Sequence, residues 1–333
     1  MAEILPVSGF NDRVRLAGVL PLKTPFTLNI FPTNLCNFRC IYCAQSQGYD
    51  YLMTRYGMDK GTMSPGTMQK IVDQCKEFPG KIKLVSFMGH GEPLLNKHLP
   101  EMVRMVHHAA IAKRIEIITN ASLLTHSMSD ALISAGLTNL RISLQGVNEG
   151  SYRRICGKKI DYGALLEEIR YYYRHKKGGG VFVKVMDIAL AEGEEAIFFE
   201  QFDGICDRMF IENVKPVYQG IAVGKDADLA TDRYGNAHPQ RKVCPLPFFS
   251  LSIWPNGDVT PCDAIYKPVI LGNVNNESLL SMWTGKIRKD FLQEQLKFNK
   301  STIPGCRDCC APDDVSHPLD VLDGDAERLM DLL

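Results

Sequence analysis

Short apolar segments alternate with longer amphipathic segments through the first two-thirds of the chain. The short segments are rich in β-branched residues, as strands buried on both faces of a parallel sheet are. We predict strands at residues 27–31, 83–88, 114–119, 139–143, 181–190 and 208–214. Six strand–helix units in series indicate a parallel sheet with right-handed crossovers, either doubly wound or curled into a barrel.

Helical segments separate these strands. Ser64 followed by Pro65 predicts the start of a helix, because serine is a favoured N-cap and proline a favoured first helical residue. We expect helices at residues 65–78, 99–112, 127–135, 162–175 and 194–204. Six strands are too few for a complete eight-stranded barrel, so a barrel built from them is incomplete.

The pattern changes after about residue 218. Residues 219–243 are polar and rich in turn-forming residues, which predicts a linker. Beyond it, two strand-like runs, FSLSIWP and VTPC, flank the pair Asn256-Gly257, a strong hairpin signal. A helix is expected at residues 278–298. We therefore predict a small second domain over residues 244–333.

Composition and charge exclude several classes of protein. The 333 residues include 38 Lys and Arg and 38 Asp and Glu, so zero net charge argues against a broad nucleic-acid-binding face. No apolar run approaches the ~20 residues that span a bilayer, and the start has no apolar secretory segment. Eleven cysteines in such a chain predict metal ligands or free thiols rather than disulfides.

Three of these cysteines directly follow the first predicted strand. Cys36, Cys40 and Cys43 have the spacing C-x3-C-x2-C, on the kind of loop where parallel α/β sheets build their sites. Three thiolates can hold three irons of a [4Fe–4S] cluster, which usually takes four, so one iron stays open to a ligand from outside the protein. The alternatives are a zinc site, which needs a fourth ligand, or three free cysteines.

With the aromatic residue Tyr42 before the third cysteine, this motif resembles the radical S-adenosylmethionine (SAM) superfamily. The segment MGHGEPLLN, after the second strand, resembles the glycine-glycine-glutamate segment of that family, which holds the methionine amino group of SAM. Gly89, Gly91 and Glu92 match that role, since glycines allow the backbone to approach a ligand closely. The resemblance places Tyr42 among the SAM-binding residues.

Two later segments extend the resemblance. ITNASLLT resembles the family's Thr-Asn-Gly-x-x-Leu segment, which places Asn120 near the ribose of SAM, with Ala121 where glycine is usual. RISLQGVNEGSYRRICG resembles the family's Ser-x-Asp-Gly stretch. It implies a SAM contact for Ser143, while Gln145 stands where the family has an acid and so removes a carboxylate base from the predicted catalytic site.

The same stretch supplies three further candidate residues. Arg153 is expected to bind the SAM carboxylate and Arg154 a substrate hydroxyl, although both positions also suit ordinary surface arginines. Cys156 is the best candidate for a thiol that returns a hydrogen atom to the substrate. The other spare cysteines are Cys75, expected in the core, and Cys206.

The resemblance implies a chemistry. SAM chelates the open iron, an electron from the cluster cleaves a C–S bond, and the 5′-deoxyadenosyl radical removes a hydrogen atom from the substrate. The electron comes from a one-electron reductant such as flavodoxin or ferredoxin. Oxygen-sensitive clusters imply a reducing, cytoplasmic setting, with neither nucleic acid nor membrane as partner.

Four more cysteines predict a second metal site. Cys244, Cys262, Cys306 and Cys309 follow the pattern C-x12-G-x4-C and then C-x2-C, which resembles the Twitch/SPASM auxiliary-cluster domain. Only Cys310 follows, so we expect one auxiliary [4Fe–4S] cluster with four protein ligands. A zinc ribbon has similar spacing, and Cys310 either replaces Cys309 as ligand or is an inert neighbour.

We therefore expect an α/β fold with a partial (β/α)6 barrel over residues 1–218, a linker over 219–243 and an auxiliary-cluster domain over 244–333. A fully ligated second cluster suits electron transfer, which favours a radical dehydrogenase of a small sugar or aminocyclitol. The spacing of the four cysteines resembles enzymes of the 2-deoxy-scyllo-inosamine dehydrogenase type. The alternatives are a sugar epimerase or dehydratase, and a maturase of ribosomal peptides. The segment 46–63 either shapes a substrate pocket or is a plain surface loop.

Overall fold

The computed structural model describes residues 1–6, 13–218, 220–221, 229–307, 309–314 and 317–333. Its strands form one sheet in the order β1-β7-β6-β5-β4-β3-β2-β8-β9-β10. Strands β2 to β7 run parallel, each beside the next along the chain, and confirm the six predicted strands. Their bounds are Thr27–Ile30, Ile82–Phe87, Ala112–Thr119, Asn139–Leu144, Gly180–Met186 and Arg208–Glu212.

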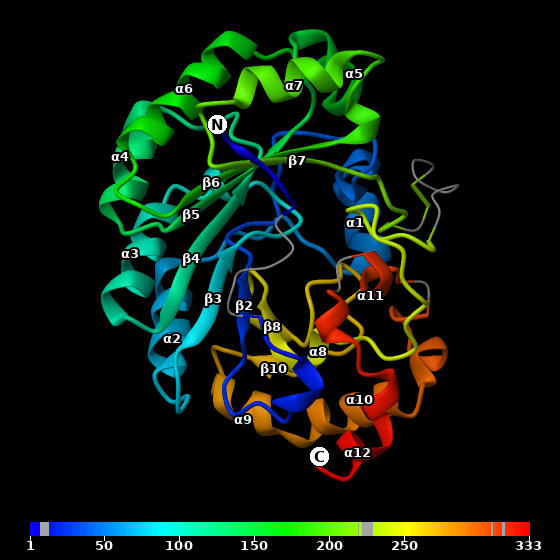
Figure 1. Cartoon of the computed structure of the whole chain (residues 1–333). Coiled ribbons are helices and arrows are strands. Elements are labelled where there is room, and N and C mark those ends of the chain that lie inside the picture. Colours follow the sequence, from blue (N-terminus) through cyan, green and yellow to red (C-terminus); the bar gives the residue numbers. More distant parts are fainter. Residues whose placement is uncertain (7–12, 219, 222–228, 308, 315–316) are drawn as a thin grey trace.

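Helices cover the outer face of these strands (Figure 1), with bounds for α2, α3, α4, α6 and α7 of Pro65–Cys75, Leu99–Ala109, His126–Ser134, Tyr162–His175 and Glu194–Phe202. The start of α2 is as predicted, because the Ser64 side chain accepts a hydrogen bond from the Thr67 amide. The predicted helix 99–112 is too long. It ends at Ala109, because Ala110 has a φ of 51° outside the right-handed helical region, and Ala112 already belongs to β4.

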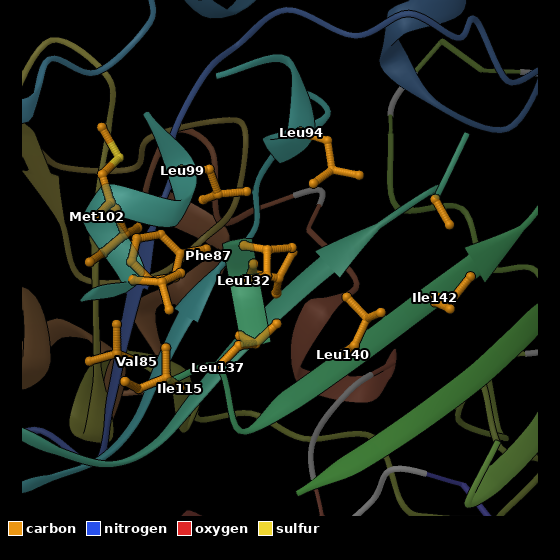
Figure 2. Close-up of a cluster of buried hydrophobic side chains, with 14 of the residues drawn as sticks. Val85, Phe87, Leu94, Leu99, Met102, Ile115, Leu132, Leu137, Leu140 and Ile142 are labelled. Carbon is orange, nitrogen blue, oxygen red and sulfur yellow. The ribbon is translucent and has the colours of Figure 1, made fainter. Parts of the chain in front are cut away.

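The core lies between the strands and these helices. In Figure 2, Val85, Phe87, Ile115, Leu140 and Ile142 from the strands meet helix residues, among them Leu99, Met102 and Leu132. Because side chains alternate between the two faces of a strand, the remaining positions point into the barrel. Several of these inner positions are polar: Asn29, Ser86, Glu116, Arg141, Ser143, Lys184 and Glu212.

The C-terminal segment continues the same sheet. Strand β8 (Ser250–Ile253) pairs parallel with β2 and antiparallel with β9 (Asp258–Thr260), which pairs in turn with β10 (Gly272–Asn273) (Figure 1). The predicted hairpin is confirmed, with Gly257 at a φ of 91° in its turn. Residues 219 and 222–228 of the expected linker lie outside the described residues.

Several elements differ from the sequence predictions. The predicted helix 278–298 is two helices, α9 (Leu279–Thr284) and α10 (Lys286–Leu296), because the backbone is extended at Gly285. Helices α1 (Tyr49–Tyr56) and α5 (Glu149–Cys156) were not expected, nor was β1 (Glu3–Ile4), which pairs with β7. The remaining short α-helices α8, α11 and α12 span Leu246–Phe249, Ala311–Asp314 and Ala326–Met330.

Short 3-10 helices complete the chain at Leu16–Gly18, Ala44–Gln47, Pro93–Leu95, Asp187–Ala189, Asn299–Thr302, Pro318–Asp320 and Asp323–Asp325. The 3-10 helix at Asp187–Ala189 ends the strand that was predicted to run to residue 190. Within the described part of the chain, every helix is too short or too polar to cross a membrane.

Candidate catalytic site with two cysteine clusters

The first cysteine loop connects β2 to α1 at the carboxyl edge of the parallel strands. The Cys36 sulfur accepts a hydrogen bond from the Phe38 amide at 3.4 Å, and the Cys36 amide donates to the hydroxyl of Tyr49 in α1 at 3.0 Å. Desolvation by burial raises the pKa of the Cys36 thiol to about 12 and raises the pKa values of Cys40 and Cys43 as well. Three thiols with raised pKa values need a cationic centre to become thiolates, as iron ligands must be.

Two glycines let the loop after β3 lie directly on this cysteine loop. A Cβ atom on Gly91 would lie 2.4 Å from the Thr33 carbonyl oxygen and 2.5 Å from the Leu35 carbonyl oxygen. Gly89 has a φ of 135°, and its Cβ would lie 2.8 Å from the Phe31 ring. No other residue fits either position without moving backbone or a buried ring. The glycine motif therefore fixes the two loops against each other.

The carboxylate of Glu92 connects the loops that follow β3 and β4. Glu92 is buried, and it accepts hydrogen bonds from the Leu94 amide at 3.0 Å, the Thr119 hydroxyl at 2.6 Å and the Asn120 amide at 2.8 Å. Desolvation raises the pKa of Glu92, although the three hydrogen bonds act to lower it. In the protein alone, the carboxylate thus holds the architecture of the site, and its predicted SAM contact stays a prediction.

Asn120 lies against the first cysteine loop. Its amide nitrogen donates to the Asn37 side-chain oxygen at 3.0 Å, and the Asn37 amide donates to the Ser122 hydroxyl at 2.8 Å. Ala121 has a φ of 59°, a left-handed conformation that glycine adopts more easily than alanine. This explains physically why glycine is usual at that position.

Gln145 lies at the cysteine loop itself. Its side-chain oxygen accepts hydrogen bonds from the Cys40 thiol at 3.2 Å and from the Tyr42 hydroxyl, while its amide nitrogen donates to the Ser143 carbonyl at 3.0 Å. Burial holds the pKa of Tyr42 well above its ordinary value, so the phenol remains a donor. The Ser143 side chain points to the inner face of β5, between core residues Ile142 and Leu144.

Helix α5 brings Cys156 to the same loop but leaves two arginines outside. The Cys156 carbonyl accepts from the Arg39 amide at 3.4 Å, and the buried Cys156 thiol donates to the Tyr152 carbonyl at 3.0 Å. Arg153 and Arg154 are exposed, and Arg154 donates to the Ala189 carbonyl at 3.2 Å. Both arginines therefore lie on the surface, as ordinary surface arginines do.

The second cysteine cluster lines a pocket with about 350 Å³ of space free of protein atoms, part of it open to solvent. Its four thiols come from Cys244, Cys262, Cys306 and Cys309, whereas Cys310 does not line it. Within the described ranges, no three His, Cys, Asp or Glu side chains converge as the ligands of a single metal ion do. Thiols spread around a pocket fit a multi-atom cluster held at its corners.

Gln295 in α10 supports this pocket and was not expected from the sequence. Its side-chain oxygen accepts from the Cys244 amide at 3.4 Å, and its amide nitrogen donates to the Cys306 sulfur at 3.7 Å. Gln295 is 0% exposed, so its amide has no access to water. A glutamine within a helix gives no sequence signal of such a role.

A group of charges lies inside the barrel, and apart from Lys184 its members were not expected there from the sequence. The carboxylate of Glu212 accepts hydrogen bonds from Lys184 and, at 3.3 Å each, from Arg141 and Arg233, and Arg233 pairs further with Asp314 in α11. Although burial opposes it, the three cations lower the pKa of Glu212 to about 2. Burial lowers the pKa of Lys184 to about 8 despite this carboxylate. Arg233 carries no motif, so only the fold could reveal this group.

Comparisons with known proteins agree with this geometry. Residues 30–190 match a family described as Radical SAM superfamily, and residues 244–310 match SPASM, an iron–sulfur cluster-binding domain. A GTP 3′,8-cyclase of Alkaliphilus oremlandii is 30% identical over 235 residues, covering 67% of this chain and 69% of the relative. A tungsten-containing aldehyde ferredoxin oxidoreductase cofactor-modifying protein of Pyrococcus furiosus is 26% identical, covering 84% of this chain and 86% of the relative.

Solved structures share the fold. Streptococcus suis SuiB bound to S-adenosylmethionine superposes with a TM-score of 0.66 and 16% identity, covering 92% of this chain and 79% of SuiB. BtrN in complex with AdoMet and 2-DOIA superposes with a TM-score of 0.54 and 17% identity, covering 85% of this chain and 92% of BtrN. The chain therefore belongs to the radical SAM superfamily with a C-terminal SPASM domain, and its cofactors are SAM and a [4Fe–4S] cluster.

Proposed function

We propose that this protein oxidises an alcohol carbon of a small sugar or aminocyclitol, with the second cysteine site holding the electron acceptor. The observation that carries this proposal is the pocket lined by four thiols, from Cys244, Cys262, Cys306 and Cys309. Four thiolates saturate a [4Fe–4S] cluster and leave no iron open to a substrate, which suits electron transfer. When bound, the first cluster and SAM supply a 5′-deoxyadenosyl radical that removes a hydrogen atom from the substrate.

The chain's own residues have distinct proposed roles. Cys36, Cys40 and Cys43 hold the catalytic cluster, and the backbone of the glycine loop receives the amino group of SAM. Asn120 and Ser143 complete the SAM site, since they lie at the carboxyl ends of β4 and β5, at the same edge of the sheet as the cysteine loop. Residues 1–218 make up the catalytic barrel and residues 244–333 the second-cluster domain. The partners are a small-molecule substrate and a one-electron reductant.

Gln145 and Tyr42 have a proposed role at the first cysteine site. The Gln145 amide oxygen accepts from the Tyr42 hydroxyl beside Cys40. It also accepts from the Cys40 thiol, but only until that cysteine binds iron as a thiolate and loses its hydrogen. A glutamine cannot act as a carboxylate base, so it positions groups and exchanges no proton. Because no carboxylate base stands at position 145, the site favours removal of a hydrogen atom over abstraction of a proton there.

A second candidate function is modification of a peptide. SuiB has also been solved with the precursor peptide SuiA, and that complex superposes with a TM-score of 0.66 over 91% of this chain. Sugar epimerisation is a third candidate, in which Cys156 returns the hydrogen atom; its thiol lies beside the cysteine loop but donates to the Tyr152 carbonyl.

One experiment separates these functions. The anaerobically reconstituted protein is given SAM, a reductant and, in turn, polyols and aminocyclitols deuterated at the alcohol carbon, GTP, and peptides. We expect deuterium in 5′-deoxyadenosine and a ketone two hydrogens lighter than its alcohol. A product with no net oxidation overturns the proposal, and solvent deuterium at a sugar carbon, lost in Cys156→Ala, identifies epimerisation.

A matched variant tests the electron acceptor. Cys244→Ala combined with Cys262→Ala is expected to keep the first cluster and SAM cleavage but to lose net oxidation. Iron analysis should fall from roughly eight to roughly four per chain. Unchanged oxidation in this variant contradicts the assignment of the second site as electron acceptor.

A further inference from the structure

Two cations on the inner face of the barrel lie close to the first cysteine loop. Lys184 in β6 is paired in register with Ser143 in β5. Two residues further along β5 comes Gln145, which accepts from the Tyr42 hydroxyl of the cysteine loop. Arg141 precedes Ser143 by two residues, so it shares the same face of the strand at a distance of roughly 7 Å. Both cations thus lie next to the predicted SAM contact Ser143.

The same two cations are connected to the second cysteine site. Both donate to the Glu212 carboxylate, which also accepts from Arg233 at 3.3 Å. Arg233 donates to Asp314 at 2.9 Å, and the Asp314 amide donates to the Cys310 carbonyl at 2.9 Å. The proposed substrate gives up a hydrogen atom at the first site and an electron at the second, so a group that binds it belongs between the two sites.

Inside the barrel the cations are open to solvent and their carboxylate partners are not. The side chains of Arg141, Lys184 and Arg233 are 15%, 12% and 17% exposed. Those of Glu212 and Asp314 are 0% and 2% exposed. A molecule that enters the barrel therefore meets guanidinium and ammonium groups, with the carboxylates behind them.

The two cations also have more N–H donors than the fold uses. Lys184 has three donors and Arg141 has five, and within the described ranges each hydrogen-bonds to Glu212 alone. Arg141 Nε is buried and has no hydrogen-bond partner among these residues. Glu116, the other carboxylate whose charge acts on Arg141, is buried and accepts from the Ser86 hydroxyl at 3.0 Å. Since unpaired buried donors are costly, the group favours a ligand that brings acceptors.

We propose that Arg141 and Lys184 bind an anionic group of the substrate, a carboxylate or a phosphate, inside the barrel. This rests on the proposed function and narrows its substrate to a sugar acid or a sugar phosphate. A guanidinium and an ammonium group suit the oxygens of either anion. The ammonium group of an aminocyclitol would instead meet two cations, because Glu212 already has three donors and no exposed surface.

The first test compares four hexoses that differ in charge. Glucose, glucosamine, glucuronate and glucose 6-phosphate are dialysed to equilibrium against the anaerobically reconstituted, SAM-loaded protein. We expect glucuronate or glucose 6-phosphate to bind at least roughly tenfold more tightly than glucose, and glucosamine no more tightly than glucose. The tighter of the two anions identifies the group as carboxylate or phosphate. Equal affinity for all four sugars, no binding of either anion, or a preference for glucosamine overturns the proposal.

The second test uses variants of the two cations. Lys184→Gln and Arg141→Gln should each weaken binding of the preferred anion by roughly tenfold to a hundredfold and leave the affinities for glucose and SAM unchanged. Lys177→Gln and Arg174→Gln, at exposed positions, are the matched controls. Arg141→Lys keeps the charge and replaces Arg141→Gln if that variant does not fold.

Two results separate the possible failures. If a variant weakens glucose and the anion equally, or weakens neither, its residue has a structural role only and the proposal is wrong. If an anionic sugar binds as expected but gives no ketone with SAM and reductant, the anion site stands and the proposed function is wrong.

Discussion

Glu212 is the most informative position for a stability test, because one carboxylate there offsets three cations. Its side chain is 0% exposed and accepts from Lys184, Arg141 and Arg233. Glu212→Gln keeps the shape and removes the charge. The variant leaves the cations inside the barrel with Asp314 as the remaining carboxylate partner of Arg233.

The expected loss follows from the acidity of Glu212. Its pKa of about 2, against an ordinary value of 4.5, means that the folded protein favours the carboxylate by about 3 kcal/mol, since each tenfold change in acidity is worth about 1.4 kcal/mol. Breaking a buried ion pair costs a similar amount, about 3–5 kcal/mol. Lys184 limits the loss, because with a pKa of about 8 it gives up its proton readily once its partner is gone. We therefore expect Glu212→Gln to lower the free energy of unfolding by about 3 kcal/mol at pH 7.

The pH dependence has a definite sign. Because the folded protein lowers the pKa of Glu212, the stabilisation is fully present above about pH 4.5 and is lost as the pH falls toward 2. The gap between the wild type and Glu212→Gln should thus be constant from pH 7 to 5 and shrink below. Anaerobic urea unfolding of samples with equal iron content measures it, with the exposed Glu200→Gln as control. A gap no larger than that of the control refutes the reasoning.

Three further outcomes are expected. Gln295→Met removes the amide donor to the Cys306 sulfur, so the second cluster should become harder to reduce and the protein less stable by about 1–3 kcal/mol, while Gln293→Met on the same helix changes neither. Cys309→Ser should lower the iron content to roughly four per chain and Cys310→Ser should leave it near eight, as iron analysis will show. Gly91→Ala should abolish SAM binding, measured by equilibrium dialysis, because its Cβ meets two backbone carbonyls.

A specific observation would contradict each of these three predictions. A second-cluster potential that is equal in the Gln295 and Gln293 variants contradicts the amide–sulfur contact. Loss of iron from Cys310→Ser rather than from Cys309→Ser reverses the ligand assignment. Full SAM affinity in Gly91→Ala means that the two loops can move apart without harm to the site.

The parallel strands could be predicted because a buried strand has a strong local signal. Strands β3 and β5 are rich in β-branched and aliphatic residues. Both strands begin and end within about two residues of their predicted bounds. The first cysteine cluster was predictable for the same reason, since its residues are close in sequence and follow a strand. A motif contained in one short segment can be recognised without knowledge of the fold.

What could not be predicted depends on residues far apart in sequence. The pairing of β2 with β8 joins segments more than two hundred residues apart, and neither segment has a residue that specifies its neighbour. The amide of Gln295 and the guanidinium of Arg233 become informative only when the fold brings cysteines or carboxylates to them. Helix α5 was missed because its hydrophobic residues are few and its glycine and serine near the start suggest a turn.

The barrel and the second cysteine site are held together by more than the sheet. Arg233 donates to Glu212 at the carboxyl end of β7 and to Asp314 in α11, and the Asp314 amide donates to the Cys310 carbonyl at 2.9 Å. A bidentate guanidinium between two buried carboxylates tolerates little sliding, because each contact fixes an angle as well as a distance. Since electron transfer depends steeply on separation, we infer that this connection keeps the two sites at a fixed spacing. Arg233→Lys, which keeps the charge but loses the bidentate contact with Asp314, should then slow the proposed electron transfer from the substrate to the second cluster.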